Sequence, residues 1–318
     1  MYNEPIFLKP VFKERIWGGT KLHEIFDYEI PSDETGECWG ISAHSNGPNE
    51  ILNGPLKGKT LTEAWEEHRE LFADQEGEDF PLLVKILDSK KDLSVQVHPD
   101  DTYAREQENE AYGKTECWYV IDCEEDAEIV FGHHAKTKEE LTQMVEHGEW
   151  DSLLRSIKVN PGDFFYVPSG TIHAIGAGVQ ILETQQSSDI TYRVYDYDRV
   201  GNDGKKRELH LDKSLDVTTV PHEDPELNRT ATSDKGLKQE TLLEEEYFGV
   251  LLWDLNGRSP EMHYKNYTLV SVIDGKGAVL VGNGRYSFKK GDHFILPSTI
   301  ESFEMEGKAN MVVSWPTK

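Results

Sequence analysis

His173 follows a bend that could present a metal ligand. It lies in the segment 160–178, NPGDFFYVPSGTIHAIGAG, where Gly162, Pro168, Gly170 and His173 have the spacing of one metal-binding hairpin of a small β-barrel. The apolar run FFYV predicts a short strand, and the proline and glycine that follow reverse the chain. A single histidine after such a turn is more often a core or turn residue, so a metal site requires further ligands.

A second candidate histidine lies in the segment 93–101, LSVQVHPDD. Side chains alternate between the two faces of a strand, so Gln96 and His98 share one face and the apolar residues occupy the other. The apolar face is expected to pack outward against a second layer, which leaves the polar face inside the barrel. A buried amide and imidazole are costly unless something binds them. We therefore predict that both residues belong to the same site as His173.

A carboxylate completes the candidate metal set. Glu116 lies 18 residues after His98, at the head of the β-prone run ECWYVID, which would place it at the barrel mouth. Taken alone, Glu116 would more often be a solvated residue at a strand start. The candidate ligands are Gln96, His98, Glu116 and His173. These nitrogen and oxygen donors suit one divalent ion per chain, such as Zn²⁺, at bond lengths of roughly 2.0 to 2.2 Å.

Three basic residues are candidates for the same cavity. Lys85 lies in PLLVKIL, where burial of an ammonium group is costly, so it either reaches the surface or faces the cavity. Lys114 shares a strand face with Glu116 if the strand begins early, and is otherwise a solvated loop lysine. In DITYRVYDYDR, Asp189 and Arg193 share the polar face. Arg193 could clamp a phosphate there, and a structural ion pair with Asp189 is the alternative.

The blocks that carry these residues resemble a cupin and, more narrowly, the type I phosphomannose isomerases. The resembling blocks are ERIWGGTKL (14–22), GECWGISAHSNGPNEILNG (36–54), FPLLVKILDSKKDLSVQVHPDD (80–101), GKTECWYV (113–120) and ILETQQSSDITYRVYDYDR (181–199). The resemblance implies that the zinc ligands are the four residues given above. It also implies that Arg193 is an active-site residue and that Asp189 supports it.

The resemblance further implies a zinc-dependent aldose-ketose isomerase that interconverts mannose 6-phosphate and fructose 6-phosphate through an enediol or enediolate. A positioned base adds roughly 10² to 10⁴ in rate to such a reaction. Lys114 and Lys85 are candidates for that base if the cavity depresses their pKa, and water at the metal is a third. Two other classes remain open at this point. They are an iron-dependent cupin dioxygenase, which also uses two histidines and a carboxylate, and a non-catalytic sugar-binding cupin.

An internal repeat predicts two barrels. The segment 160–170 matches KKGDHFILPST at 289–299 with an offset of 129 residues. WYVIDCEEDAEIVFG (118–132) resembles LVSVIDGKGAVLVG (269–282), with Ile121 and Asp122 on Ile273 and Asp274, an offset of 152. The difference, 152 − 129 = 23 residues, is accounted for by the stretch 136–158, whose apolar residues have helical spacing. Only the first unit carries this stretch.

The second unit lacks the metal set, because the offsets place Thr268 and Ser302 where the first unit has Glu116 and His173. We expect a mainly β fold of two cupin-type (jelly-roll) β-barrels with a small helical addition. The expected divisions are an N-terminal catalytic domain (1–220) with helical segments near 60–73 and 137–156, a linker (221–240), and a C-terminal domain without metal ligands (241–318).

The charge of the chain limits its partners. Asp and Glu number 59 against 33 Lys and Arg, which gives a formal net charge of −26. Such a surface repels nucleic acid and anionic lipid, and no basic stripe opposes it. Because charges are screened over about 8 Å at physiological ionic strength, a few sequestered basic residues can still bind a small anion. We therefore expect a small-molecule sugar phosphate as partner, and neither nucleic acid nor a membrane.

Length and cysteine content agree with an intracellular enzyme. The 318 residues suggest about two domains. No run approaches the ~18 apolar residues that span a bilayer, and the start MYNEPIFLKP lacks the pattern of a signal peptide. The three cysteines have no CxxC spacing, so the sequence indicates neither a disulfide framework nor a cysteine-based zinc site. We expect a cytoplasmic monomer or weak homo-oligomer.

Overall fold

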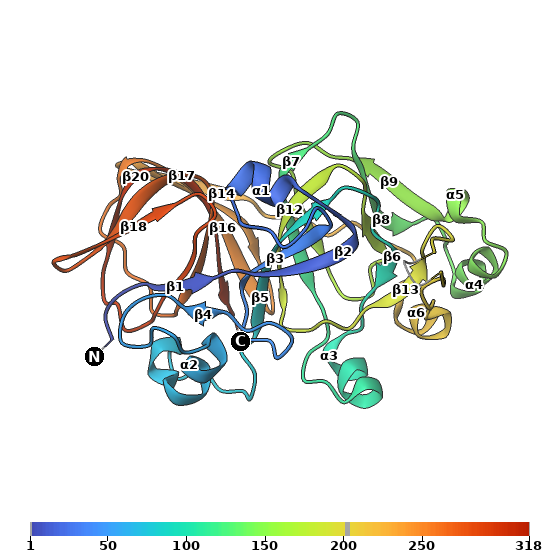
Figure 1. Cartoon of the computed structure of the whole chain (residues 1–318). Coiled ribbons are helices and arrows are strands. Elements are labelled where there is room, and N and C mark those ends of the chain that lie inside the picture. Colours follow the sequence, from blue (N-terminus) through green and yellow to red (C-terminus); the bar gives the residue numbers. More distant parts are fainter. Residues whose placement is uncertain (1, 201–203, 318) are drawn as a thin grey trace.

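Antiparallel β-sheets make up most of the structure, a computed structural model that describes residues 2–200 and 204–317. The strands form three sheets of six, five and nine strands, and short helices connect or cover them (Figure 1). The prediction of a mainly β fold is confirmed. Within the described ranges, no helix combines the length and the apolar character needed to cross a membrane.

Strands between residues 11 and 195 form two facing sheets. Trp118 and Ile181 of one sheet share a buried core with Phe131 of the other. The six-stranded sheet has the order β10 (Phe164–Val167), β7 (Glu116–Cys123), β12 (Val179–Gln186), β5 (Leu82–Ser89), β3 (Thr35–Ile41), β2 (Val11–Gly19). The five-stranded sheet has the order β13 (Tyr192–Tyr195), β6 (Val95–Val97), β11 (His173–Ile175), β8 (Glu128–His133), β9 (Leu154–Lys158).

Helices cover the outer face of the five-stranded sheet. Val95 and Val97 of β6 belong to a buried cluster that also contains Leu141 and Leu153 from two of these helices. The apolar side chains of β6 therefore point outward, as the alternation predicted, and Gln96 points to the opposite face. The covering helices are α4 (Lys138–Glu146), α5 (Trp150–Leu153) and α6 (Leu211–Val217).

The two expected helical segments are present, with one correction. The segment 60–73 contains α2 (Leu61–Glu67), which begins with a capping box at Thr60 and Glu63, and a 3₁₀ helix, η1 (Arg69–Phe72). The helical part of 137–156 ends at Leu153, because the residues that follow pair with β8 as strand β9. The remaining helices are α1 (Lys21–Phe26), α3 (Asp101–Tyr103) and a π-helical turn, η2 (Ala104–Glu108).

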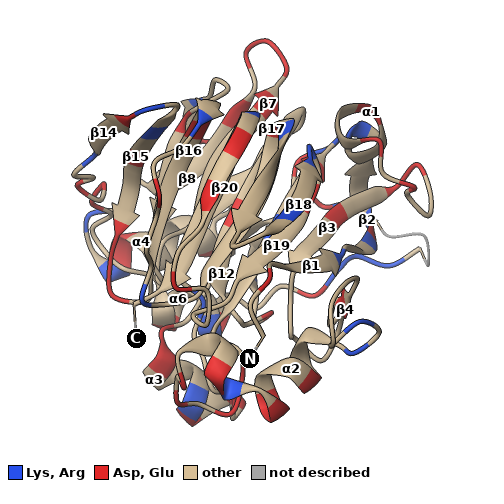
Figure 2. Cartoon of the chain, turned by 90° about the vertical axis from the view of Figure 1, so that its left-hand side faces the viewer, with Lys and Arg blue, Asp and Glu red and all other residues tan. Residues whose placement is uncertain are grey.

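The nine-stranded sheet takes in strands from both ends of the chain (Figure 2). Ile6 of β1 pairs with Ile295 of β19, so residues expected in the N-terminal domain complete the C-terminal sheet. The segment expected as a linker, 221–240, contains β14 and the start of β15. The sheet order is β14 (Thr230–Asp234), β15 (Leu237–Glu244), β16 (Phe248–Arg258), β20 (Glu304–Pro316), β17 (Thr268–Val281), β19 (His293–Leu296), β1 (Ile6–Lys9), β4 (Glu50–Ile51), with β18 (Gly284–Lys289) on β17.

An aromatic cluster joins the α2–η1 segment to the C-terminal sheet. The ring of Phe72 lies 5.2 Å from that of Tyr267, which directly precedes β17. Trp65 of α2 lies 5.3 Å from the ring of Phe80. All four rings are almost fully buried. Contacts between aromatic rings stabilise the fold beyond the burial of their apolar area, so the α2–η1 segment stabilises the packing of the two halves of the molecule.

We expect the substitution Phe72→Ala to lower the free energy of unfolding by about 3 to 5 kcal/mol, because it leaves a cavity in this cluster. Denaturation by urea, followed by circular dichroism, measures the loss. Leu52→Ala is the control, since Leu52 is 43% exposed, and should change the same free energy by less than about 0.5 kcal/mol. Equal losses in the two variants would show that the cluster does not stabilise the fold.

Candidate metal centre and catalytic cavity

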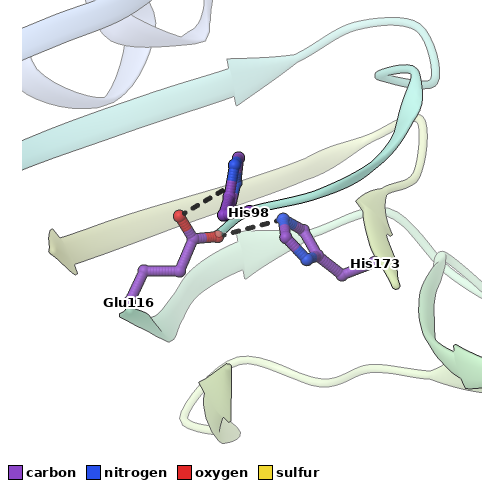
Figure 3. A group of neighbouring side chains, drawn as sticks. All are labelled: His98, Glu116 and His173. Carbon is purple, nitrogen blue, oxygen red and sulfur yellow. Dashed lines mark ion pairs between the residues drawn. The ribbon is translucent and has the colours of Figure 1, made fainter. Parts of the chain in front are cut away.

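Three of the predicted ligands lie together inside the N-terminal half. His98 directly follows β6, Glu116 begins β7 and His173 begins β11. Their ligand atoms all lie within 4.8 Å of one another, and none of the three residues is more than 1% exposed. Figure 3 shows both imidazole rings directed toward the Glu116 carboxylate. The starts of two strands and the end of a third thus bring one donor atom each to the same place.

Backbone carbonyls fix which nitrogen of each histidine faces the carboxylate. Nδ1 of His98 lies 2.8 Å from the carbonyl oxygen of Ile190, and Nδ1 of His173 lies 2.8 Å from that of Thr171. A carbonyl oxygen can only accept, so each Nδ1 carries the proton and each Nε2 keeps a free lone pair. The Nε2 atoms lie 3.6 and 3.3 Å from the carboxylate oxygens of Glu116. Metal-ligating histidines are oriented in this way.

The protonation states of the three residues also suit a cation. Burial lowers the pKa of His98 well below its usual value, and burial lowers the pKa of His173 as well. For Glu116, burial alone would raise the pKa, but the ammonium group of Lys114 outweighs it and lowers the pKa. Two neutral imidazoles and a carboxylate are the forms that bind metals. Nε2 of His173 is buried and has no hydrogen-bond partner among the described residues, a deficit that a bound cation would remove.

Lys114 contacts two of the three residues. Its Nζ lies 2.7 Å from Oε2 of Glu116 and 3.2 Å from Nε2 of His98. It precedes β7, yet it is buried, so the alternative of a solvated loop lysine is wrong. Burial alone would lower its pKa, but the carboxylates of Glu116 and Glu183 outweigh burial and raise the pKa. The lysine therefore keeps its proton, whereas the role of a base requires a depressed pKa.

A further buried carboxylate, Glu183 of β12, faces the same group and was not among the predicted site residues. Its Oε1 lies 3.6 Å from Nζ of Lys85 and 4.0 Å from Nζ of Lys114, and Nε1 of Trp118 donates to its Oε2 at 3.1 Å. Burial, together with the nearby Glu116 carboxylate, raises the pKa of Glu183. An acidic residue inside the otherwise uncharged run ILETQQ is the sequence signal that could have identified it.

A cavity of about 530 Å³ opens beside this group. Gln96 lines it and lies opposite His173 in the pairing of β6 with β11, so the fourth predicted ligand adjoins the other three. Positive side chains in a cleft raise the local concentration of anions, even on a chain with a net charge of −26. The cavity is lined by three acidic residues (Glu37, Glu183, Asp189) and by six basic ones (Lys13, Arg15, Lys85, Lys114, Arg193, Arg207).

Arg193 and Asp189 both line this cavity without pairing with each other. Arg193 donates from Nε to Oγ of Ser94 at 3.3 Å and from Nη1 to the carbonyl oxygen of Glu208 at 2.8 Å. Asp189 lies in the loop before β13 and accepts a hydrogen bond of 2.7 Å from Nδ2 of Asn46. The ion pairs of the described residues include none between the two. The alternative of a structural pair is therefore wrong.

Comparison with known proteins agrees with this geometry. Residues 6–140 match the family profile of the phosphomannose isomerase type I catalytic domain, and residues 238–316 match that of the mannose-6-phosphate isomerase cupin domain. The chain is 56% identical to the mannose-6-phosphate isomerase ManA of Bacillus subtilis over 314 residues, which cover 99% of both chains. The chain belongs to the type I phosphomannose isomerase family.

Other phosphomannose isomerases also match this chain over almost its whole length. The mannose-6-phosphate isomerase of Streptococcus mutans is 51% identical over 313 residues, 98% of both chains. The crystal structure of the mannose 6-phosphate isomerase of Bacillus subtilis superposes with a TM-score of 0.96 at 54% identity, over 98% of this chain and 100% of that one. Family membership favours the isomerase prediction over the dioxygenase and the non-catalytic sugar-binding cupin.

Residues 238–316, which match the cupin profile, form no second metal cluster among the described residues. His98, Glu116 and His173 are the single group of three or more close His, Cys, Asp or Glu ligands in residues 2–200 and 204–317. The buried histidine of the second unit, His293, instead contacts the hydroxyls of Ser271 and Tyr28 at 2.8 and 3.1 Å.

Proposed function

We propose that this chain interconverts mannose 6-phosphate and fructose 6-phosphate. The supporting observation is the buried group of His98, Glu116 and His173 at the edge of a basic cavity, in a chain more than half identical over its length to ManA. Two imidazoles and a carboxylate suit a divalent cation, and the basic wall suits a phosphate. A metal site next to an anion site suits a metal-dependent isomerase that acts on sugar phosphates.

The bound ion in this proposal is Zn²⁺, one per chain, held by His98, Glu116 and His173, with Gln96 as the fourth ligand. When bound, the ion stabilises negative charge that develops on the sugar oxygens, a contribution commonly worth about 3 to 4 kcal/mol. The N-terminal domain, residues 1–220, contains all four ligands and is the catalytic domain. The C-terminal domain, residues 241–318, supports it through the strands and aromatic contacts described above.

Arg193 and Arg207 bind the phosphate of the substrate in this proposal. Both line the cavity, and the planar guanidinium group of an arginine can donate two hydrogen bonds to a phosphate at once. Arg207 is oriented by Asp196, whose Oδ2 accepts from its Nε at 2.8 Å. Asp189 accepts a hydrogen bond from Asn46 and so holds the Asn46 side chain in place, where it also lines the cavity. The sugar is thereby placed with its reacting carbons toward the buried carboxylates.

Glu183 carries the proton between C1 and C2 of the open-chain sugar. It removes a proton from one carbon to give the enediol or enediolate and returns it to the neighbouring carbon, while the hydroxyl proton of one of these carbons passes to the carbonyl oxygen of the other. A raised pKa makes this carboxylate a stronger base than an ordinary one. The Nζ atoms of Lys85 and Lys114 lie 3.6 and 4.0 Å from its Oε1, and these ammonium groups stabilise negative charge on the sugar oxygens and hold Glu183 in place.

The reaction is tested by incubating metal-loaded protein with fructose 6-phosphate in deuterated water. We expect mannose 6-phosphate with deuterium at C2, because a carboxylic proton exchanges with solvent between its removal and its return. Nuclear magnetic resonance detects both the product and the label. Absence of conversion would contradict the proposed function, whereas conversion without label would contradict proton transfer by Glu183 and leave the isomerase intact.

The phosphate role of Arg193 predicts a defect in substrate binding. We expect Arg193→Met to raise the KM for fructose 6-phosphate at least about tenfold, since a charge-assisted contact is worth about 1.5 to 3 kcal/mol. Metal content should change little, because the hydrogen bonds of the Arg193 side chain go to Ser94 and to the carbonyl oxygen of Glu208 and not to a ligand side chain. Steady-state kinetics measures the change. The control is Arg258→Met, on the exposed surface of the C-terminal sheet, and an equal rise in its KM would refute the assignment.

A further inference from the structure

A second hollow lies on the C-terminal sheet, between α1 and the strands β17, β18 and β20. Its volume is about 990 Å³, larger than the 530 Å³ of the catalytic cavity, and the two share no lining residue. Figure 2 looks onto this sheet and shows blue segments on β18 and toward α1. The hollow is lined by two acidic residues (Asp27, Glu306) and by five basic ones (Lys276, Arg285, Lys289, Lys290, Lys308).

Three of these lysines form a row across adjacent strands. Lys276 of β17 is directly opposite Lys289 of β18 on one side and Lys308 of β20 on the other. Directly opposed residues project from the same face of a sheet with Cβ atoms about 5 Å apart. Like charges in such positions destabilise the sheet. This arrangement is unexpected in a chain where acidic residues outnumber basic ones by 59 to 33.

The carboxylates near the row compensate its charge only in part, since Asp292 interacts electrostatically with Lys289 but forms no ion pair with it. Arg285 pairs with Glu306 at 3.0 Å, and Lys290 lies 3.7 Å from Asp274. The lysines of the row have no ion pair among the described residues, and all three are exposed. Their charges are therefore available to a partner, and a partner with several negative charges would relieve the repulsion between them.

Apolar side chains and bare backbone form the rest of the hollow. Ile25 and Phe26 of α1 line one wall and Phe288 of β18 lines another. Gly277 and Gly307 are paired at the floor, and a Cβ on Gly277 would lie 2.4 Å from the carbonyl oxygen of Glu306, so the close spacing of the strands requires glycine there. Pockets of roughly 300 to 1,000 Å³ hold small organic ligands.

We propose that this hollow binds a small organic polyanion, a di- or triphosphate attached to an apolar or planar group. The lysine row contacts the phosphates, and the planar part lies against the apolar wall beside α1. A macromolecular polyanion is disfavoured, because the surrounding surface of a chain with a net charge of −26 repels it. The inference does not depend on the isomerase reaction, since the two sites share no residue.

Isothermal titration calorimetry on the full-length protein tests the proposal, with ATP as the probe and with inorganic tripolyphosphate and adenosine as its separate parts. We expect ATP to bind more tightly than either part, and more weakly as salt increases. Lys276→Gln should weaken ATP binding about tenfold, the effect of one lost charge-assisted contact. The same variant should raise the melting temperature of the unliganded protein by about 1 to 4 °C, because the repulsion is removed.

Two further variants make the outcomes distinct. Lys238→Gln changes an exposed lysine on β15 of the same sheet and should leave ATP binding unchanged. Arg193→Met in the catalytic cavity should also leave it unchanged. Binding lost in Arg193→Met but kept in Lys276→Gln would place the probe in the catalytic cavity and overturn the proposal. Failure of ATP to bind at low salt, or equal binding by Lys276→Gln and the unchanged protein, would overturn it as well.

Discussion

Replacement of His173 by alanine is expected to remove the bound metal and, with it, the isomerase activity. The metal content should fall from about one ion per chain to a small fraction, because one of the three donors that are buried together is lost. We expect kcat/KM to fall by at least about 10³, since the stabilisation of charge on the sugar oxygens is lost. Metal content is measured by plasma mass spectrometry, and activity by the conversion of fructose 6-phosphate.

The matched control for this change lies in the second unit of the chain. Ser302 occupies the position that corresponds to His173, and Ser302→Ala should keep both metal and activity. Circular dichroism shows whether each variant is folded. A His173→Ala variant that keeps its metal and its activity would contradict the proposed metal site. A variant that keeps the metal but loses activity would show that His173 is needed for the reaction but does not bind the metal.

Replacement of Glu183 by glutamine is expected to keep the metal and lower kcat by about 10² to 10⁴, the usual contribution of a positioned acid or base. The amide has nearly the shape of the carboxylate but cannot take up a proton. In the unchanged enzyme, burial raises the pKa of Glu183, and a base must be deprotonated to act. Activity should therefore fall as the pH drops through a value above the usual carboxyl range. This acidic limb should be absent from the pH profile of Glu183→Gln.

Glu37 is the control for Glu183, because it is also buried and lines the same cavity. Its carboxylate accepts from Arg15 at 2.8 Å and from Nε1 of Trp39 at 2.7 Å. Burial alone would raise its pKa, but Lys85 and Arg15 outweigh burial and lower the pKa, so this carboxylate stays charged. Glu37→Gln should therefore reduce kcat less than about tenfold and keep the acidic limb. Equal losses in the two variants would show that any buried charge in the cavity has this effect.

The sequence was sufficient for those parts of the site that depend on local strand geometry. Alternation along residues 93–98 correctly placed Gln96 opposite to the apolar residues, because the two faces of a strand are fixed by its backbone. The turn before His173 could be identified from its proline and glycine, and the strand that starts at Glu116 from its run of β-prone residues. Each of these inferences needs only a few consecutive residues.

The features of the site and fold that the sequence did not predict depend on contacts between residues far apart in the chain. Glu183 faces Lys85 because β12 pairs with β5, a contact between residues nearly 100 positions apart. The burial of Lys114 in a loop depends on the two carboxylates around it, and alternation describes only strands. The hairpin of β14 and β15 lies in a polar segment without an apolar face, so composition alone indicated a linker.

Two strands from the start of the chain, β1 and β4, complete a sheet whose other strands all lie after residue 229. Leu8 of β1 pairs with Ile51 and Ile6 pairs with Ile295, so during translation β1 can pair with β4 early but meets β19 only after residue 295 has been made. Contacts between residues so distant in sequence form slowly, because the intervening chain must first be ordered. Closure of the sheet between β1 and β19 is thus postponed until residues 293–296 have been synthesised. A truncated chain that begins after residue 9 would expose the edge of β19, a surface on which strands of other molecules can pair.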